Sequence, residues 1–384
     1  MIHQNPHAVN DMINTDVATN AYNMYKTDIN LIKQINGNSY RISISWSRIL
    51  PSGFSDYINF EGIQYYGNVI NEMIEQNITP VVTIYHWDLP QKLQELGRWT
   101  NPLFVNWFVD YAKVLFTAFG DQVKYWITIA EPSVMCYFSY NGDFAPGFNQ
   151  SGIGDYLCGH HALIAHAKTY RMCHQEFRQQ QNGYIGIELF LTWQLYPNMQ
   201  MKLQKFMERP CLGSFGTVVT IKKLPHHLNK SVSFMEDTRM TSIFSATPKA
   251  KLTPIDMAKA IKHVLKPYKS IPSIIITKSG YEDNGELHDK HRAIFYHHTL
   301  YHVLKLISEG VNIRGSKVRE PISASSIKDS ECSGIVISLG SMRHMSGQIK
   351  ETCPFDNAVL DDRSRDDYDD EPVVCENLYL AWAL

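Results

Sequence analysis

The sequence predicts an α/β fold in which a parallel sheet curls into a (β/α) barrel. Short β-branched runs alternate with amphipathic helical stretches through the first half of the chain, which is typical of βαβ units. Successive strands lie roughly 40 to 60 residues apart, a spacing that fits a barrel with elaborated loops. The length of 384 residues allows one large domain or two to three smaller ones, and a hydrophobic content of 44% can supply a sizeable core.

Four strands and two helices are predicted in the first half of the chain. The strands are short runs rich in β-branched and aromatic residues, at positions 40–46, 80–87, 125–129 and 184–190. One helix is expected at 62–76 and another at 103–119. In the second helix, apolar residues recur at three- and four-residue spacing: Phe104, Phe108, Tyr111, Leu115 and Phe119. This spacing lines one face of a helix, so we expect that face to cover the sheet.

The second half of the chain is less regular. A buried strand is predicted at 273–277 and a helix at 293–306. Two further strands are possible at 216–223 and 334–339, although no clear partner helix follows either. The acidic run at 361–371 (DDRSRDDYDDE) predicts a solvated and partly disordered tail rather than a binding element.

The charge and composition exclude several kinds of partner. A net charge of −2 offers no field suited to nucleic acid or to an anionic membrane surface. No run approaches the 18 or so apolar residues of a membrane-spanning helix. The first residues (MIHQNP) lack the layout of a secretory signal, so we expect the chain as written to remain in the cytosol. Three glycosylation sequons, at Asn77, Asn149 and Asn229, stand against that expectation.

The seven cysteines give no sign of a metal site. Their number is odd and no two have the CxxC spacing. This pattern favours buried free thiols over a disulfide framework.

Polar side chains cluster at the carboxyl ends of three predicted strands. The residues at these ends are WSR at 46–48, HWD at 86–88 and AEP at 130–132. In a (β/α) barrel all of the strands open their carboxyl ends at the same mouth, where the chemistry lies. Three such clusters on successive strands therefore predict a functional site rather than ordinary packing.

Long motifs in a consistent order resemble family 1 glycoside hydrolases, the β-glucosidase and myrosinase group. They are YRISISWSRILPSG (40–53), NFEGIQYYGNVINEMIEQNITPVVTIYHWDLPQ (59–91), GRW (97–99), TIAEP (128–132) and APG (145–147). The likeness covers residues 10–193 and returns at 272–315. It implies a (β/α)8 TIM barrel domain at 1–315, in which 201–252 cannot be aligned. A divergent segment with the acidic tail would follow at 316–384.

The resemblance also implies that the barrel is incomplete. The family's first strand would precede Met1, and its eighth strand is not recognisable beyond Gly315. A barrel without these two strands has open edges, so we expect low stability and aggregation through those edges. Members of this family are often secreted.

The family's activity is retaining hydrolysis of O-glycosyl bonds, which needs two carboxylates about 5 Å apart and no cofactor. The resemblance makes Glu131 the acid/base and gives His86 and Trp87 contacts with the sugar. Arg41 resembles the arginine that holds the nucleophile ionised. A buried arginine needs a carboxylate partner in any case, because an unpaired buried charge is very costly. The implied substrate is a small β-glycoside or oligosaccharide.

Two departures from the family's pattern lie at the site itself. The nucleophile belongs to an Ile-Thr-Glu-Asn-Gly segment, and residues 276–280 of this chain are ITKSG, so that Lys278 stands at its position. An ammonium group cannot form the glycosyl ester that the mechanism requires. Ala130 replaces the asparagine that binds the sugar's 2-hydroxyl. The sequence therefore predicts a β-glucosidase-like protein with impaired catalysis. The alternatives are a non-catalytic pseudoenzyme that binds a glycoside or a protein, and a poorly closed fold without function.

Overall fold

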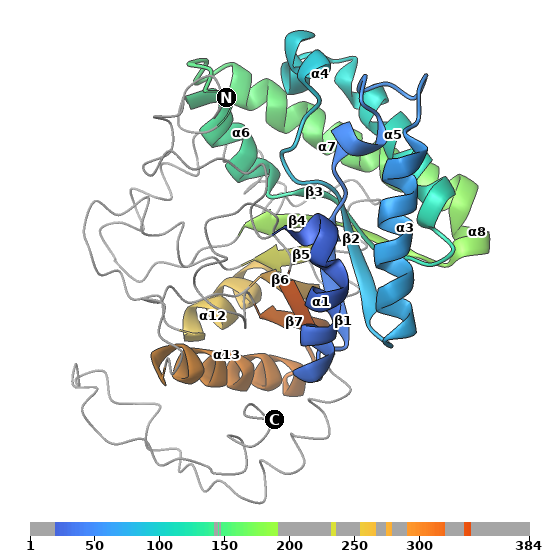
Figure 1. Cartoon of the computed structure of the whole chain (residues 1–384). Coiled ribbons are helices and arrows are strands. Elements are labelled where there is room, and N and C mark those ends of the chain that lie inside the picture. The colour runs from blue at the N-terminus through green and yellow to red at the C-terminus, as the bar shows by residue number, and fades with distance from the viewer. Residues whose placement is uncertain are drawn as a thin grey trace, which may run out of the picture.

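The computed structural model contains a closed barrel of eight strands with helices packed around its outside (Figure 1). It describes residues 20–141, 145, 147–190, 232–235, 254–265, 274–278, 290–318 and 334–338. The strands are β1 (Ser39–Ser43), β2 (Thr79–Tyr85), β3 (Tyr125–Ala130), β4 (Tyr184–Phe190), β5 (Val232–Met235), β6 (Ile274–Lys278), β7 (Ile313–Val318) and β8 (Gly334–Ser338). Each strand pairs with its neighbours in the sequence, and β8 pairs with β1 to close the ring.

The helices follow the strands in the alternation that the sequence predicts. They are α1 (Ala21–Gln34), α2 (Trp46–Ile49), α3 (Phe60–Glu75), α4 (Gln91–Glu95), α5 (Phe104–Phe119), α6 (Pro132–Asn141), α7 (Gly154–Met172), α8 (Arg178–Gln181), α12 (Pro254–Leu265) and α13 (Lys290–Ser308). Two shorter helical segments lie between these helices in the sequence: η2 (Arg98–Thr100) between α4 and α5, and η3 (Cys173–Phe177) between α7 and α8. The prediction of a (β/α) barrel is confirmed.

The expectation of two open edges is wrong. β1 to β7 run parallel, and β8 runs antiparallel to both β7 and β1. Val336, in the middle of β8, lies opposite Ser39 on one side and Lys317 on the other. Strand pairing uses backbone N–H and C=O groups, so an extended segment can complete a barrel without the family's sequence pattern. The strand suggested at 334–339 therefore takes the closing position.

Two other strands were not predicted from the sequence. β5 lies inside the 201–252 segment that could not be aligned, and its four residues are too short to show a periodic pattern. β7 runs across position 315 and pairs with β8. Barrel strands thus continue past 315, and we propose to extend the barrel domain to residue 338. The strand suggested at 216–223 and the acidic run at 361–371 lie outside the described residues.

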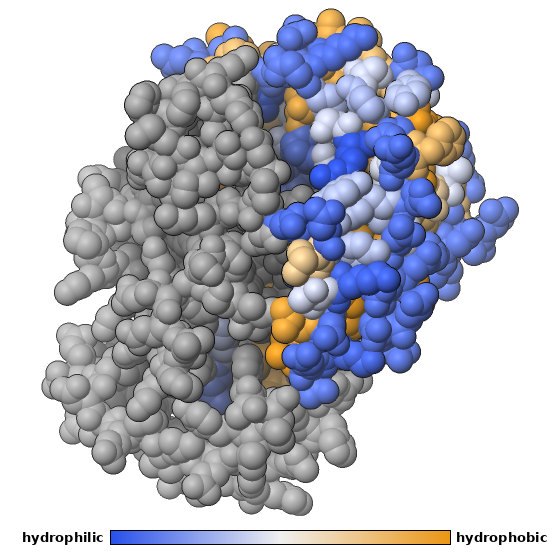
Figure 2. All heavy atoms as spheres, in the orientation of Figure 1, coloured by the Kyte–Doolittle hydropathy of each residue, from blue (hydrophilic) through white to orange (hydrophobic). Residues whose placement is uncertain are grey.

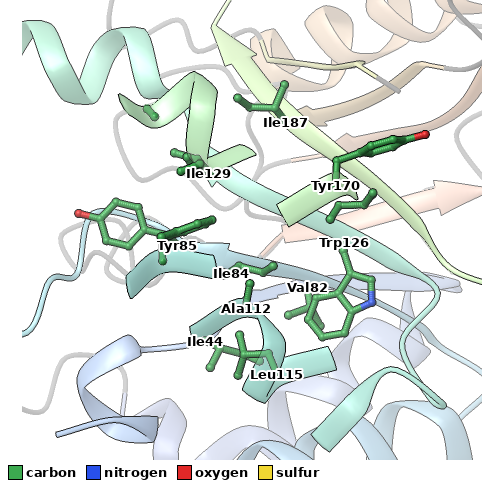
Figure 3. Packing of buried hydrophobic residues seen from close by; sticks show 14 of the residues in the cluster. Ile44, Val82, Ile84, Tyr85, Ala112, Leu115, Trp126, Ile129, Tyr170 and Ile187 are labelled. Carbon is green, nitrogen blue, oxygen red and sulfur yellow. The ribbon is translucent and has the colours of Figure 1, made fainter. Parts of the chain in front are cut away.

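The apolar face of α5 packs on the barrel as its spacing predicts. Phe104, Phe108 and Leu115 are fully buried, and Figure 3 shows Leu115 in a layer with side chains of β2 and β3. The Trp46 ring stacks on the Tyr111 ring with centroids 4.5 Å apart. The outer surface that Figure 2 shows for the described helices is largely hydrophilic. Among the described residues, no helix has both the length and the apolar character needed to cross a bilayer.

The cysteine prediction is wrong for one pair and confirmed for one thiol. Cys136 of α6 and Cys158 of α7 form a disulfide, with their Cα atoms 5.6 Å apart. These helices lie against each other, a neighbourhood that the linear spacing of cysteines does not reveal. Cys173 is a buried free thiol, and burial raises its pKa to about 11. The other four cysteines lie outside the described residues.

Candidate active site

The predicted site residues lie at or near the carboxyl ends of parallel strands, as the sequence predicts. His86 and Trp87 directly follow β2, Ala130 ends β3, and Lys278 is the last residue of β6. Glu131 directly follows β3 and is buried, with 3% of its surface exposed. Because β1 to β7 are parallel, these ends open at one mouth of the barrel. Arg41 lies deeper, in the middle of β1.

Two of these residues have a left-handed backbone conformation. φ is 77° at Trp87 and 45° at Glu131. Positive φ is uncommon for residues other than glycine, and such strain concentrates at functional sites. A hydrogen bond joins the two strand ends, because the indole Nε1 of Trp87 donates to the carbonyl oxygen of Ala130 over 2.8 Å. The backbone N–H of Glu131 donates to the carbonyl oxygen of Glu188 in β4, at 3.1 Å.

The strands that carry Glu131 and Lys278 each have an irregular register near the mouth. From Ile127 to Ala130 the register moves three positions along β3 but only two along β4. From Ile276 to Lys278 the register moves two positions along β6 but only one along β5. An extra residue of this kind bends a strand and redirects its side chains, and it is common at barrel rims and beside active sites. The sequence contains no local signal for either irregularity.

Asp88 connects the segments that follow β1 and β2. Its Oδ2 accepts a hydrogen bond from the backbone N–H of Trp46 at 3.1 Å, and its Oδ1 accepts a longer one from that of His86 at 3.4 Å. Burial raises the pKa of the Asp88 carboxyl, although hydrogen bonds from its own backbone, from the Ser45 side chain and from the His86 backbone, together with the charge of His86, act in the opposite direction. The sequence shows Asp88 at a strand end but does not reveal this bridging position.

Arg41 has the carboxylate partner that its burial requires, and that partner is Glu188. The Arg41 Nη1 and Nη2 atoms donate to the two carboxylate oxygens of Glu188 at 2.7 and 2.6 Å. The Nε atom donates to Thr83 Oγ1 at 2.7 Å, and Thr277 Oγ1 donates to Glu188 Oε1 at 2.6 Å. Arg41 is 1% exposed and Glu188 is fully buried.

Sequence reasoning missed Glu188, although one signal was present. Its strand, YIGIELF, is otherwise apolar apart from its leading tyrosine, and a lone carboxylate in a buried strand needs a cation. Arg41, a buried cation, likewise needs a carboxylate partner. Nothing in the linear order of the two residues, which lie 147 positions apart, pairs them.

No group of three or more histidine, cysteine, aspartate or glutamate residues within the described ranges could hold a metal ion. The network around Arg41 consists of one guanidinium, two hydroxyls and one carboxylate.

The sequence profile of glycosyl hydrolase family 1 matches residues 1–211, which is more than half of the chain. Myrosinase 1 from Brevicoryne brassicae is 48% identical over 189 residues, which make up 49% of this chain and 41% of that protein. The chain thus spans less than half the length of this curated relative. Beta-glucosidase 42 from Arabidopsis thaliana is 31% identical over a longer alignment, which covers 79% of this chain and 76% of that protein.

Solved structures show the same likeness. An aphid myrosinase matches with a TM-score of 0.66 and 31% identity, and the match covers 81% of each chain. A β-glucosidase from Thermotoga maritima in complex with castanospermine matches with a TM-score of 0.72 and 27% identity, over 83% of this chain and 81% of that one. The family profile matches more than half of the chain, and the longer alignment covers more than two thirds of both proteins. The chain therefore belongs to glycosyl hydrolase family 1.

Proposed function

We propose that this protein binds a small β-glycoside or oligosaccharide at the mouth of its barrel, and that its glycosidase chemistry is impaired. The observation that carries the proposal is Lys278, the last residue of β6, which stands where the family resemblance expects the nucleophile. A retaining glycosidase needs one carboxylate to attack the sugar and a second to protonate the leaving oxygen. In this chain Glu131 supplies the second carboxylate, and position 278 does not supply the first.

The remaining residues favour retention of sugar binding over retention of catalysis. His86 and Trp87 follow β2 at the mouth, where an imidazole and an indole can contact the hydroxyls and the face of a sugar ring. Ala130 offers a methyl group in place of an amide, so one hydrogen bond to the substrate is lost. Loss of one member of a catalytic unit can lower turnover by a factor on the order of 10⁴ to 10⁶.

Two assays separate binding from catalysis. Deoxynojirimycin and castanospermine, which occur in complexes of the Thermotoga maritima β-glucosidase, serve as probes of binding by calorimetry. A chromogenic aryl β-glucoside, with and without azide as a substitute nucleophile, measures hydrolysis. We expect saturable binding of at least one probe and no detectable hydrolysis without azide. Lys278→Glu should recover little activity, because Ala130 still deprives the transition state of a hydrogen bond.

Each outcome decides one part of the proposal. Hydrolysis within a hundredfold of an ordinary β-glucosidase would overturn the impaired catalysis. Failure of both probes to bind a folded sample would overturn the glycoside site and favour a protein-binding role. Deoxynojirimycin is the control, because azide-dependent turnover that this probe does not suppress does not arise at the site where the probe binds.

A further inference from the structure

The buried ion pair of Arg41 and Glu188 joins four strands inside the barrel. Arg41 belongs to β1 and Glu188 to β4, and their two parallel hydrogen bonds measure 2.7 and 2.6 Å. Thr83 of β2 and Thr277 of β6 complete the network through their hydroxyl groups. All four side chains are buried. A bidentate pair in such surroundings holds its two groups in one geometry.

Glu188 also contacts Glu131 and the residue directly before Lys278. Its carbonyl oxygen accepts the N–H of Glu131, the residue with positive φ that follows β3. Its carboxylate accepts the hydroxyl of Thr277, the residue directly before Lys278. The backbone of Glu188 therefore restrains one side of the site, and its side chain restrains the other.

We propose that Glu188 is a positioning residue, which balances the charge of Arg41 and holds the end of β3 and the end of β6 in place around the mouth. Its role as a support of the glycoside site rests on the proposed function, whereas the charge balance with Arg41 does not. Glu188 is not a replacement nucleophile, because its side chain is fully buried and both of its oxygens accept hydrogen bonds from Arg41.

Position 278 directly follows Thr277, whose hydroxyl is bonded to the buried carboxylate of Glu188, and Arg41 balances the charge of that carboxylate. A like charge nearby raises the pKa of a carboxyl group. The carboxylate that Lys278→Glu introduces should therefore titrate at a higher pH while Glu188 is charged. Replacing Glu188 by the isosteric, neutral glutamine should lower that titration midpoint by about one pH unit.

The first experiment follows the introduced carboxyl carbon by NMR during a pH titration. Its signal is identified by comparison with the parent protein, so that no enzymatic activity is needed. The pair to compare is Lys278→Glu and Lys278→Glu/Glu188→Gln. The matched control adds Glu176→Gln instead, because Glu176 pairs with Lys113 at 2.6 Å but is 45% exposed. We expect a lower midpoint with Glu188→Gln and no change with Glu176→Gln. Equal midpoints in all three variants would overturn the positioning role.

The second experiment tests the charge balance in the protein as it stands. Arg41→Gln, Glu188→Gln and the double variant are compared by their unfolding equilibrium constants. Breaking a buried pair leaves an uncompensated charge or unsatisfied groups, whereas removing both partners costs less. If the two substitutions acted independently, each would multiply the unfolding equilibrium constant of the parent by its own factor. We expect the constant of the double variant to be at least about 100-fold smaller than the product of the two factors predicts. If Glu188→Gln alone fails to fold, adding Arg41→Gln should restore folding.

The exposed pair of Lys113 and Glu176 is the control for this comparison. The unfolding equilibrium constant of its double variant should agree with the product of the two single effects to within about fivefold. Multiplicative effects for Arg41 and Glu188 would overturn the proposal. Failure of the glycoside probes to bind would overturn the proposed function alone, because neither the NMR titration nor the unfolding cycle uses a ligand.

Discussion

At the scale of single residues, the mouth of the barrel is held by one hydrogen bond from a side chain to the backbone and one between backbone groups. Trp87 and Glu131 adopt positive φ, a conformation that costs a residue with a side chain about 1 kcal/mol or more. Such a conformation persists only where the surroundings stabilise it. The bond from the Trp87 indole to the Ala130 carbonyl and the bond from the Glu131 N–H to Glu188 supply that stabilisation.

Trp87→Phe should test the first of these bonds. Phenylalanine keeps an aromatic ring but cannot donate to the Ala130 carbonyl oxygen, which becomes unsatisfied. We expect the free energy of unfolding to fall by about 1–2 kcal/mol, measured by urea titration. Trp107→Phe is the control, because Trp107 is a half-buried tryptophan on α5 that packs edge-on against Phe54. An equal loss in both variants would show that ring size, not the hydrogen bond, accounts for the effect.

Asp88 should make stability fall with rising pH. Burial raises its folded-state pKa, so between the ordinary carboxyl value and the raised value the folded protein holds more protons than the unfolded chain. In that window the free energy of unfolding decreases as pH rises. Asp88→Asn removes this contribution while keeping an oxygen that can accept the Trp46 N–H. We therefore expect the variant to gain stability relative to the parent from about pH 4 upward.

Urea titrations at pH 4, 5, 6 and 7 measure this difference. Glu61→Gln, which changes an exposed carboxylate in the first turn of α3, is the control for the loss of one carboxylate. A stability difference between Asp88→Asn and the parent that does not change with pH would contradict the expected proton uptake.

At the scale of elements, the disulfide between α6 and α7 anchors the segment that begins at the site. α6 starts at Pro132, directly after Glu131, and its Cys136 is bonded to Cys158 of α7. α7 in turn packs against β3 and β4, the strands that flank Glu131. The disulfide therefore connects the backbone that follows the predicted acid/base to the outer helical layer.

Removing this disulfide should destabilise the protein. A crosslink across 22 residues restricts the unfolded chain by an amount worth about 3 kcal/mol at 25 °C. We expect Cys136→Ser/Cys158→Ser to lower the free energy of unfolding by about that amount, and a reducing agent to have the same effect on the parent. Cys173→Ala controls for loss of a thiol, and its stability should not respond to the reducing agent beyond the response of the parent.

At the scale of the whole molecule, the barrel is complete because its ends are joined by a strand from late in the sequence. β8 occupies the place between β7 and β1 and runs against both. A closed barrel has no strand edge on which another chain could add. The aggregation that we expected from open edges is therefore not expected of the barrel that the structure describes.

Truncation should expose the edges that β8 covers. A chain that ends at residue 318 lacks β8, and a chain that ends at residue 340 retains it. We expect the shorter chain to lose cooperative thermal unfolding and to scatter light at concentrations where the longer chain stays dispersed. The comparison uses differential scanning calorimetry and static light scattering. Identical behaviour of the two chains would show that β8 contributes nothing to closure.

The sequence by itself determined the class of fold, and it predicted where along the chain the site lies. Alternating strands and helices predicted the barrel, because hydrophobic periodicity is a local property that each segment carries alone. Polar residues after β2 and β3 predicted the mouth for the same reason, since all parallel strands open at one end. Lys278, at the position where the family resemblance expects the nucleophile, is likewise visible in the linear pattern ITKSG.

Only the tertiary structure decided which residues meet across the barrel. The pairing of Arg41 with Glu188, the disulfide of Cys136 and Cys158, and the closure by β8 all join segments that are distant in the sequence or lack a local signal. Sequence patterns report what a segment prefers, such as burial, but not which of many partners satisfies that preference. A buried charge, for example, requires an opposite charge, and only the packing of strands around a common interior brings that charge to it.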